Sequence, residues 1–133
     1  MLEHDRFWWT LVVIGWITIA SGLLQCFVPA ILLQVLSPDV SAASNHFLSI
    51  TGVLTAAFGA LLVNALVSPG YQPAAILWTG IQKTITAAVV GLAIQDKIFS
   101  PLAIGAAAFD LVAGVMILAY WFWIKELQKE QSL

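Results

Sequence analysis

Four long runs of apolar residues constrain the fold of this chain more than any other feature. They cover residues 7–28, 45–67, 74–94 and 102–124, and each has roughly the 20 residues that a helix needs to cross a ~30 Å hydrocarbon core. Charged residues make up only 9% of the 133 positions, whereas soluble domains carry about 25%. The sequence therefore predicts an all-α fold, a single integral membrane domain built as a four-helix bundle over residues 1–133.

The connections between these runs carry signals for helix ends. Residues 30–36 are apolar but too short to cross a bilayer, so they predict an interfacial helix or the frayed end of the first span. A serine followed by proline is typical of a helix start, with the serine as N-cap. Ser37 and Pro38 therefore predict that the second helix begins near Pro38, and Ser100 and Pro101 predict the start of the fourth.

An even number of spans places both termini on the same side of the membrane. That side carries Arg6, Lys125 and Lys129, and the other side carries Lys97 alone, so the positive-inside rule predicts cytoplasmic termini. Aromatic rings, which favour the membrane interface, also gather toward the terminal side. These rings belong to Trp8, Trp9, Tyr71, Trp78, Tyr120, Trp121 and Trp123.

Two opposite charges lie inside the apolar runs. Lys83 is about 14 Å from the terminal-side surface at 1.5 Å per residue, and Asp110 is about 18 Å from it in a ~30 Å core. A lone charge at this depth costs at least ~2.5–3.5 kcal/mol, which favours an intramembrane ion pair between the two residues on neighbouring antiparallel helices. The functional alternatives are a proton or ion relay, or a polar pocket in which the pair holds a ligand head.

Other polar residues extend this possible pocket. Gln82 flanks Lys83, while Gln25, His46 and Asn64 lie within the first two spans. Each has a simpler interpretation as an interhelical hydrogen-bonding group. We expect no metal site, because no second histidine, cysteine or carboxylate stands at ligand spacing from His46.

The motifs that usually carry enzyme chemistry are missing. The sequence contains no H-E-x-x-H, G-x-S-x-G, Walker or C-x-x-C motif, so we predict no catalytic residue. It also contains no basic run that would bind nucleic acid. The partners we expect are membrane lipid and other membrane protein subunits.

The layout of the four runs resembles that of DoxX-like and related small four-helix bacterial membrane proteins. The resemblance covers the whole chain and rests on Phe27-Val28-Pro29 at the end of the first run, Gly52 with Phe58-Gly59-Ala60 in the second, and Phe109-Asp110-Leu111 in the fourth. The third run departs from the family pattern, since Lys83 stands where a glutamate-and-glycine motif is expected. The resemblance implies the same architecture in a bacterial inner, or internal, membrane, and it assigns no site residue.

We therefore expect a non-enzymatic accessory or assembly subunit of a larger membrane complex. A ridge of small residues at Gly52, Ala56 and Ala60 suits helix contacts, either inside the bundle or with another chain. Two alternatives remain open: a bundle that binds a small molecule or lipid, and an oligomeric proton- or ion-coupled transporter that uses Lys83 and Asp110.

Overall fold

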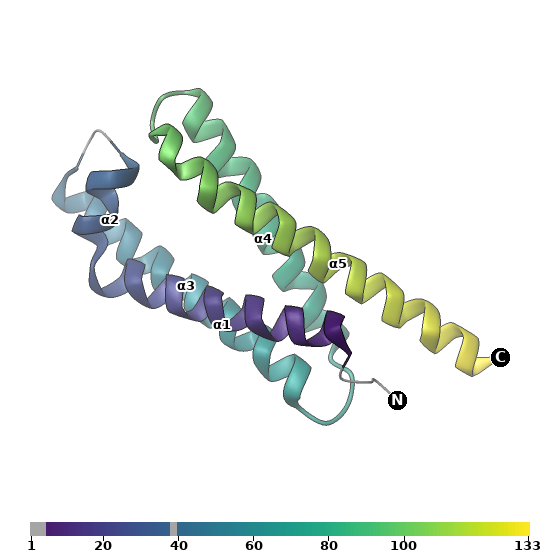
Figure 1. The fold of residues 1–133 in the computed structure, drawn as a ribbon. Coiled ribbons are helices and arrows are strands. Elements are labelled where there is room, and N and C mark those ends of the chain that lie inside the picture. Colours follow the sequence, from purple (N-terminus) through teal and green to yellow (C-terminus); the bar gives the residue numbers. More distant parts are fainter. Residues whose placement is uncertain (1–4, 38–39) are drawn as a thin grey trace.

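The computed structural model describes residues 5–37 and 40–133 and consists of helices in this part of the chain. The first described residues of the chain, its C-terminal end and the connection over residues 68–72 lie at one end of an elongated bundle, which we call the terminal end (Figure 1). Four of the described helices are long and apolar enough to cross a membrane. The elements in chain order are α1 (Arg6–Phe27), α2 (Pro29–Leu36), α3 (Ala42–Val67), α4 (Pro73–Gln95), the 3-10 helix η1 (Pro101–Ala103) and α5 (Ile104–Ser132).

The observed helix boundaries differ from the expected ones at the connection between α2 and α3. Ser37 is the C-cap of α2 and does not begin α3; the N-cap of α3 is Ser41, which forms a capping box with Ser44. The prediction for Ser37 was wrong because a second serine four residues later offers reciprocal hydrogen bonds to the first turn. Pro38 and Asp39 lie outside the described residues.

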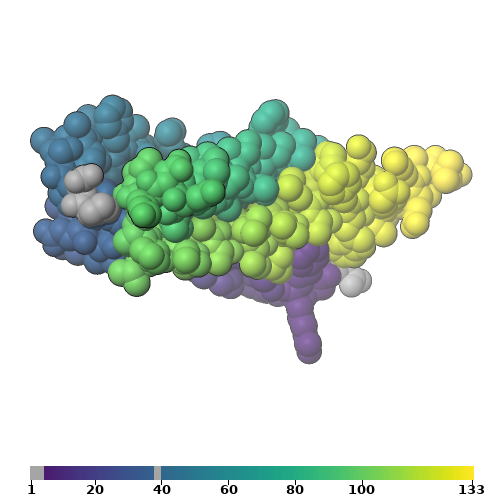
Figure 2. Space-filling view, turned by 90° about the horizontal axis from the view of Figure 1, so that it is seen from above, coloured from purple at the N-terminus to yellow at the C-terminus, as the bar shows by residue number. Residues whose placement is uncertain are grey.

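The predicted start of the last span is confirmed, since Ser100 is the N-cap and Pro101 is the first residue of the helical span. Ser100 precedes η1 without a side-chain capping bond, and the continuous helix α5 starts at Ile104. At its other end, α5 continues past residue 124 to Ser132, so its last turns project beyond the other helices (Figures 1 and 2).

The four long helices form two closely packed hairpins, α1 with α3 and α4 with α5. Glycines set the distance between α1 and α3. A Cβ on Gly15 would lie 3.4 Å from the carbonyl oxygen of Gly59, and a Cβ on Gly22 would lie 2.6 Å from that of Gly52. The backbones therefore touch directly, as small residues allow in membrane helices.

The hairpins join each other through an apolar core near the terminal end. Its side chains come from the first half of α1, the last turns of α3, the start of α4 and the middle of α5. Burying them away from solvent or lipid gives the contact that fixes the two hairpins together. The core residues are Trp8, Leu11, Val12, Ile14, Leu62, Ala65, Leu66, Ile76, Ala113, Ile117, Tyr120 and Ile124.

At the opposite end the hairpins meet through backbone polar groups. The backbone N–H of Ser100 donates to the carbonyl of Leu36 at 2.7 Å, and its hydroxyl donates to the carbonyl of Val35 at 2.9 Å. These carbonyls belong to the last turn of α2, where helical partners are missing. The short helix α2 thereby ties the first hairpin to the connection between α4 and α5.

Candidate functional site

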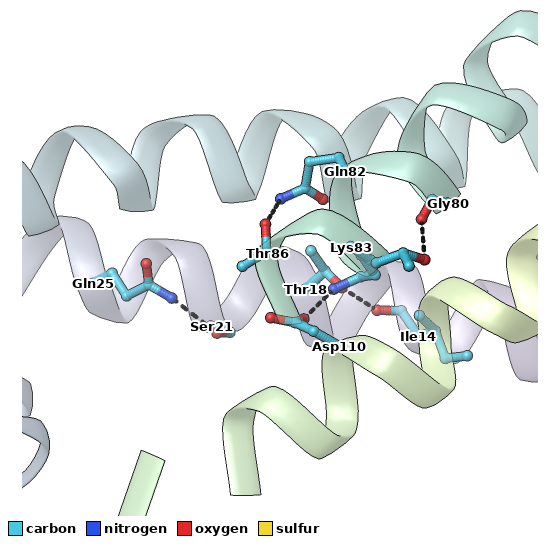
Figure 3. Close-up of polar contacts among 10 residues, drawn as sticks. Ile14, Thr18, Ser21, Gln25, Gly80, Gln82, Lys83, Thr86 and Asp110 are labelled. Atoms are coloured by element: carbon cyan, nitrogen blue, oxygen red, sulfur yellow. Dashed lines mark hydrogen bonds and ion pairs between the residues drawn. The ribbon is translucent and has the colours of Figure 1, made fainter. Parts of the chain in front are cut away.

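Lys83 of α4 and Asp110 of α5 form an ion pair within the second hairpin. The Lys83 Nζ lies 2.9 Å from the Asp110 Oδ1 (Figure 3). It lies 5.1 Å from the centre of the Phe109 ring. The lysine side chain is 3% exposed and the aspartate side chain 20%. The ammonium group therefore meets both a carboxylate and an aromatic face in a site from which solvent is nearly excluded.

Small residues bring α4 and α5 close enough for this contact. A Cβ on Gly114 would lie 3.1 Å from the carbonyl oxygen of Gly80 and would collide with the hydroxyl of Thr84. That hydroxyl donates to the Gly80 carbonyl at 2.9 Å, so it is satisfied within α4. The glycine contact thus positions Lys83, one turn of helix from Gly80, against the neighbouring helix.

The chemistry available to the pair follows from its unequal burial. Lys83 is enclosed, so its charge depends on Asp110 for compensation. Asp110 keeps part of its side chain exposed and can therefore receive a proton or a polar ligand from outside the hairpin. The arrangement can serve as a structural clamp between α4 and α5 or as a polar site at the face of α5.

Gln82 lies next to Lys83 in sequence but belongs to a different side of α4. Its Nε2 donates to the Thr86 Oγ1 at 3.1 Å, and Figure 3 shows this contact apart from the ion pair. The Gln82 Oε1 is buried and has no hydrogen-bond partner in the part of the chain that the structure describes. A buried amide oxygen without a partner marks a place where a donor would be stabilised.

The remaining predicted polar residues are distributed over the first hairpin. Gln25 donates to the Ser21 hydroxyl at 3.4 Å along α1. His46 and Asn64 are both exposed, near opposite ends of α3. Asn64 accepts a hydrogen bond from the Ser68 hydroxyl at 3.2 Å.

The packing of α3 explains why these residues do not converge. Gly52 and Gly59 turn one face of α3 toward α1, which leaves the face with His46 and Asn64 on the outside of the hairpin. The two residues are also about 27 Å apart along the helix axis at 1.5 Å per residue. Of the six residues in the predicted pocket, the structure brings Lys83 and Asp110 into direct contact.

Two parts of the ridge predicted on α3 have different surroundings. Gly52 and Ala56 pack against α1 around Gly22, whereas Ala60 is exposed.

Among the described residues, no group of three or more histidine, cysteine or acidic side chains is placed to hold a metal ion.

Sequence reasoning missed a polar group at the terminal end. Tyr71, which the sequence indicates only as an interfacial aromatic, has a buried hydroxyl with no hydrogen-bond partner among the described residues. The signal that was available is its place directly after Ser68-Pro69-Gly70, since such a turn folds the chain back over the helix ends.

Comparison with known proteins identifies no matching family model, no curated protein with a significant match and no solved structure with one. The resemblance to DoxX-like proteins is therefore still a prediction, and the candidate site rests on the geometry described above.

Proposed function

We propose that the protein is a non-enzymatic integral membrane protein that serves as an accessory or assembly subunit of a larger membrane complex. The observation that supports this most is that Lys83 and Asp110 pair with each other inside one hairpin. The Nζ–Oδ1 distance is 2.9 Å, and the lysine is buried. A pair of this kind fixes the arrangement of α4 and α5. The groups left to meet a partner are then on the outer surfaces of the helices.

The outer part of the second hairpin offers a surface suited to another helix. Gly91 of α4 and Gly105 of α5 are exposed, and a Cβ on either would have no neighbour within 4 Å. Ala108, also exposed and about one turn of helix from Gly105, extends this surface along α5. Small residues let membrane helices approach closely, and in the α1–α3 hairpin the chain already uses glycines in this way.

The proposed setting is a bacterial inner, or internal, membrane with both termini in the cytoplasm. Arg6, Lys125 and Lys129 at the terminal end, against Lys97 at the other, support this orientation. Membrane lipid surrounds the helices in this proposal, and other membrane subunits are the protein partners.

The proposal is tested by extracting the tagged full chain from its native membrane in mild detergent, separating complexes by size and identifying co-migrating proteins by mass analysis. We expect the chain to migrate with other membrane proteins and Gly105→Leu to weaken that association. Ala20→Leu, which adds the same side chain to an exposed position of α1, is the matched control. A single species of one 14.3 kDa chain would contradict the proposal.

A second candidate function is a proton- or ion-coupled carrier, or a binder of small molecules, that uses the ion pair. The partly exposed side chain of Asp110 and the unpaired Oε1 of Gln82 favour it. A pH-dependent flux in liposomes that is lost in Asp110→Asn would support the carrier. A ligand that remains bound after gentle purification and is lost in Gln82→Leu would support the binder.

A further inference from the structure

A pocket of about 550 Å³ lies at the terminal end of the bundle, away from the Lys83–Asp110 pair. It is formed between the α3–α4 connection and the last turns of α5, and Trp8 of α1 contributes to its wall. Its volume is within the range of about 300–1,000 Å³ that is typical of small-molecule sites. The pocket therefore has the size of a binding site, and it is open on one side, where exposed Gln128 and Gln131 line it.

Most of the lining is apolar. Leu66 of α3, Ile76 of α4 and Ile124 of α5 belong both to this lining and to the core between the hairpins. The base of the pocket is thus the packed contact that joins the two halves of the molecule, so its shape is fixed by the core.

The hydroxyl of Tyr71 is the main polar group of the pocket. It is buried and has no hydrogen-bond partner among the described residues. Burial raises the pKa of the Tyr71 phenol, so the group keeps its proton at neutral pH and can donate a hydrogen bond. A buried polar group without a hydrogen-bond partner is unfavourable, and a ligand with an acceptor would satisfy it.

The charge of the lining limits what the ligand can be. The other lining residues with polar side-chain atoms are Trp8, Ser68, Tyr120, Gln128 and Gln131, and every described residue of the lining is uncharged. An anionic or cationic head would have to lose water against a lining that carries no charge of its own. The lining therefore favours an uncharged head that forms hydrogen bonds.

The place of the pocket indicates where such a ligand comes from. Val67, Ser68 and Pro69 mark the point where the apolar span of α3 ends, and all three line the pocket. Trp8, Tyr71 and Tyr120 stand around it, which is typical of the depth at which head groups meet acyl chains.

We propose that this pocket binds one molecule of an uncharged membrane lipid of the acylglycerol class, with a head-group oxygen accepting a hydrogen bond from Tyr71 and the chain lying along Leu66 and Ile124. The site is separate from the ion pair and from the glycine surface of the second hairpin, so it does not depend on the accessory-subunit proposal.

The experiment uses the purified full chain in mild detergent, with bound lipid counted by native mass spectrometry. Mono-oleoylglycerol is the probe, and oleate and oleylamine carry comparable chains with an anionic and a cationic head. We expect saturable binding of one mono-oleoylglycerol, with at least tenfold weaker binding of the two charged probes.

Two variants locate the site. Tyr71→Phe removes the hydroxyl and should weaken binding roughly five- to tenfold, the effect of one hydrogen bond. Gln128→Trp places a large ring in the pocket from an exposed position of α5 and should abolish binding without disturbing the core. Glu130→Trp, at an exposed position of α5 outside the lining, should bind the probe like the unmodified chain.

The outcomes decide the proposal. Absence of saturable binding, or equal binding of oleate, would overturn it. Unchanged binding in Gln128→Trp would overturn the location even if Tyr71→Phe does not fold, because residue 128 lies on the exposed tail of α5.

Discussion

Gly22 of α1 and Gly52 of α3 face each other so closely that neither position has room for a side chain. A Cβ on Gly22 would lie 2.6 Å from the carbonyl oxygen of Gly52, and a Cβ on Gly52 would lie 2.5 Å from that of Gly22. Both obstacles are backbone atoms of a packed helix, which cannot rotate away as a side chain can.

We predict that Gly22→Ala destabilises the protein by about 1–3 kcal/mol, because the helices must separate to admit the methyl group. Gly105→Ala is the control, since its Cβ would have no neighbour within 4 Å; it should be neutral or stabilise by up to about 1 kcal/mol. Unfolding by a denaturing detergent, followed through helical circular dichroism, gives both values. Equal effects of the two substitutions would contradict the close contact.

The buried ion pair predicts that the effects of substituting Lys83 and Asp110 on stability are not additive. Lys83→Met leaves the Asp110 carboxylate without its counter-charge and should cost about 3–5 kcal/mol, while Lys83→Met combined with Asp110→Leu should recover most of that loss. The comparison is with Lys129→Met, which breaks the exposed Lys129–Glu126 pair and should change stability by less than about 1 kcal/mol. Folded yield and the free energy of unfolding of the three variants measure the coupling; harmless single changes would show that the pair is not needed for stability.

The four-helix arrangement predicts the accessibility of two points on the chain. A reporter fused after Leu133 and one inserted at residues 96–99, in the α4–α5 connection, should report opposite sides of the membrane. If the termini are cytoplasmic, a phosphatase reporter is active only in the connection. The same result at both points would contradict the four spans.

Tyr71 predicts a change of stability at alkaline pH. Burial raises its pKa above the ordinary value of 10.0, so the folded state holds the phenol proton more tightly than the unfolded state. The resulting stabilisation is fully present below pH 10 and is lost as the pH rises through the folded-state pKa. Unfolding titrations at pH 8 to 12 should therefore show a steeper fall for the unmodified chain than for Tyr71→Phe, and parallel curves would contradict a buried phenol.

The sequence predicts the main helices and the equivalent placement of both termini, because long apolar runs and the alternation of spans determine them. It does not predict the division into two hairpins. Small residues such as Gly15, Gly80 and Gly91 look alike in a sequence, and only packing shows that Gly15 and Gly80 lie against a partner helix while Gly91 has free space around it.

In the candidate site, too, some features are predictable from the sequence and others depend on packing. Depth and neighbouring helices place Lys83 near Asp110, and the structure contains their contact. The outward position of His46 depends on how α3 rotates to pack Gly52 against α1, which periodicity alone does not determine. The pocket at Tyr71 arises where the start of α1, the end of α3, the start of α4 and the later turns of α5 lie together. Residues this far apart in sequence give no local pattern.

The glycine contact between α1 and α3 also determines when during synthesis the molecule acquires its shape. Both partners of that contact precede Pro73, so the first hairpin can close on leaving the translocation machinery, before α4 and α5 have been made. The second hairpin depends on its own contact between Gly80 and Gly114 and follows later. We therefore expect assembly to end with the docking of the two hairpins in the bilayer, and a chain that stops after α3 to leave the core side of the first hairpin facing lipid.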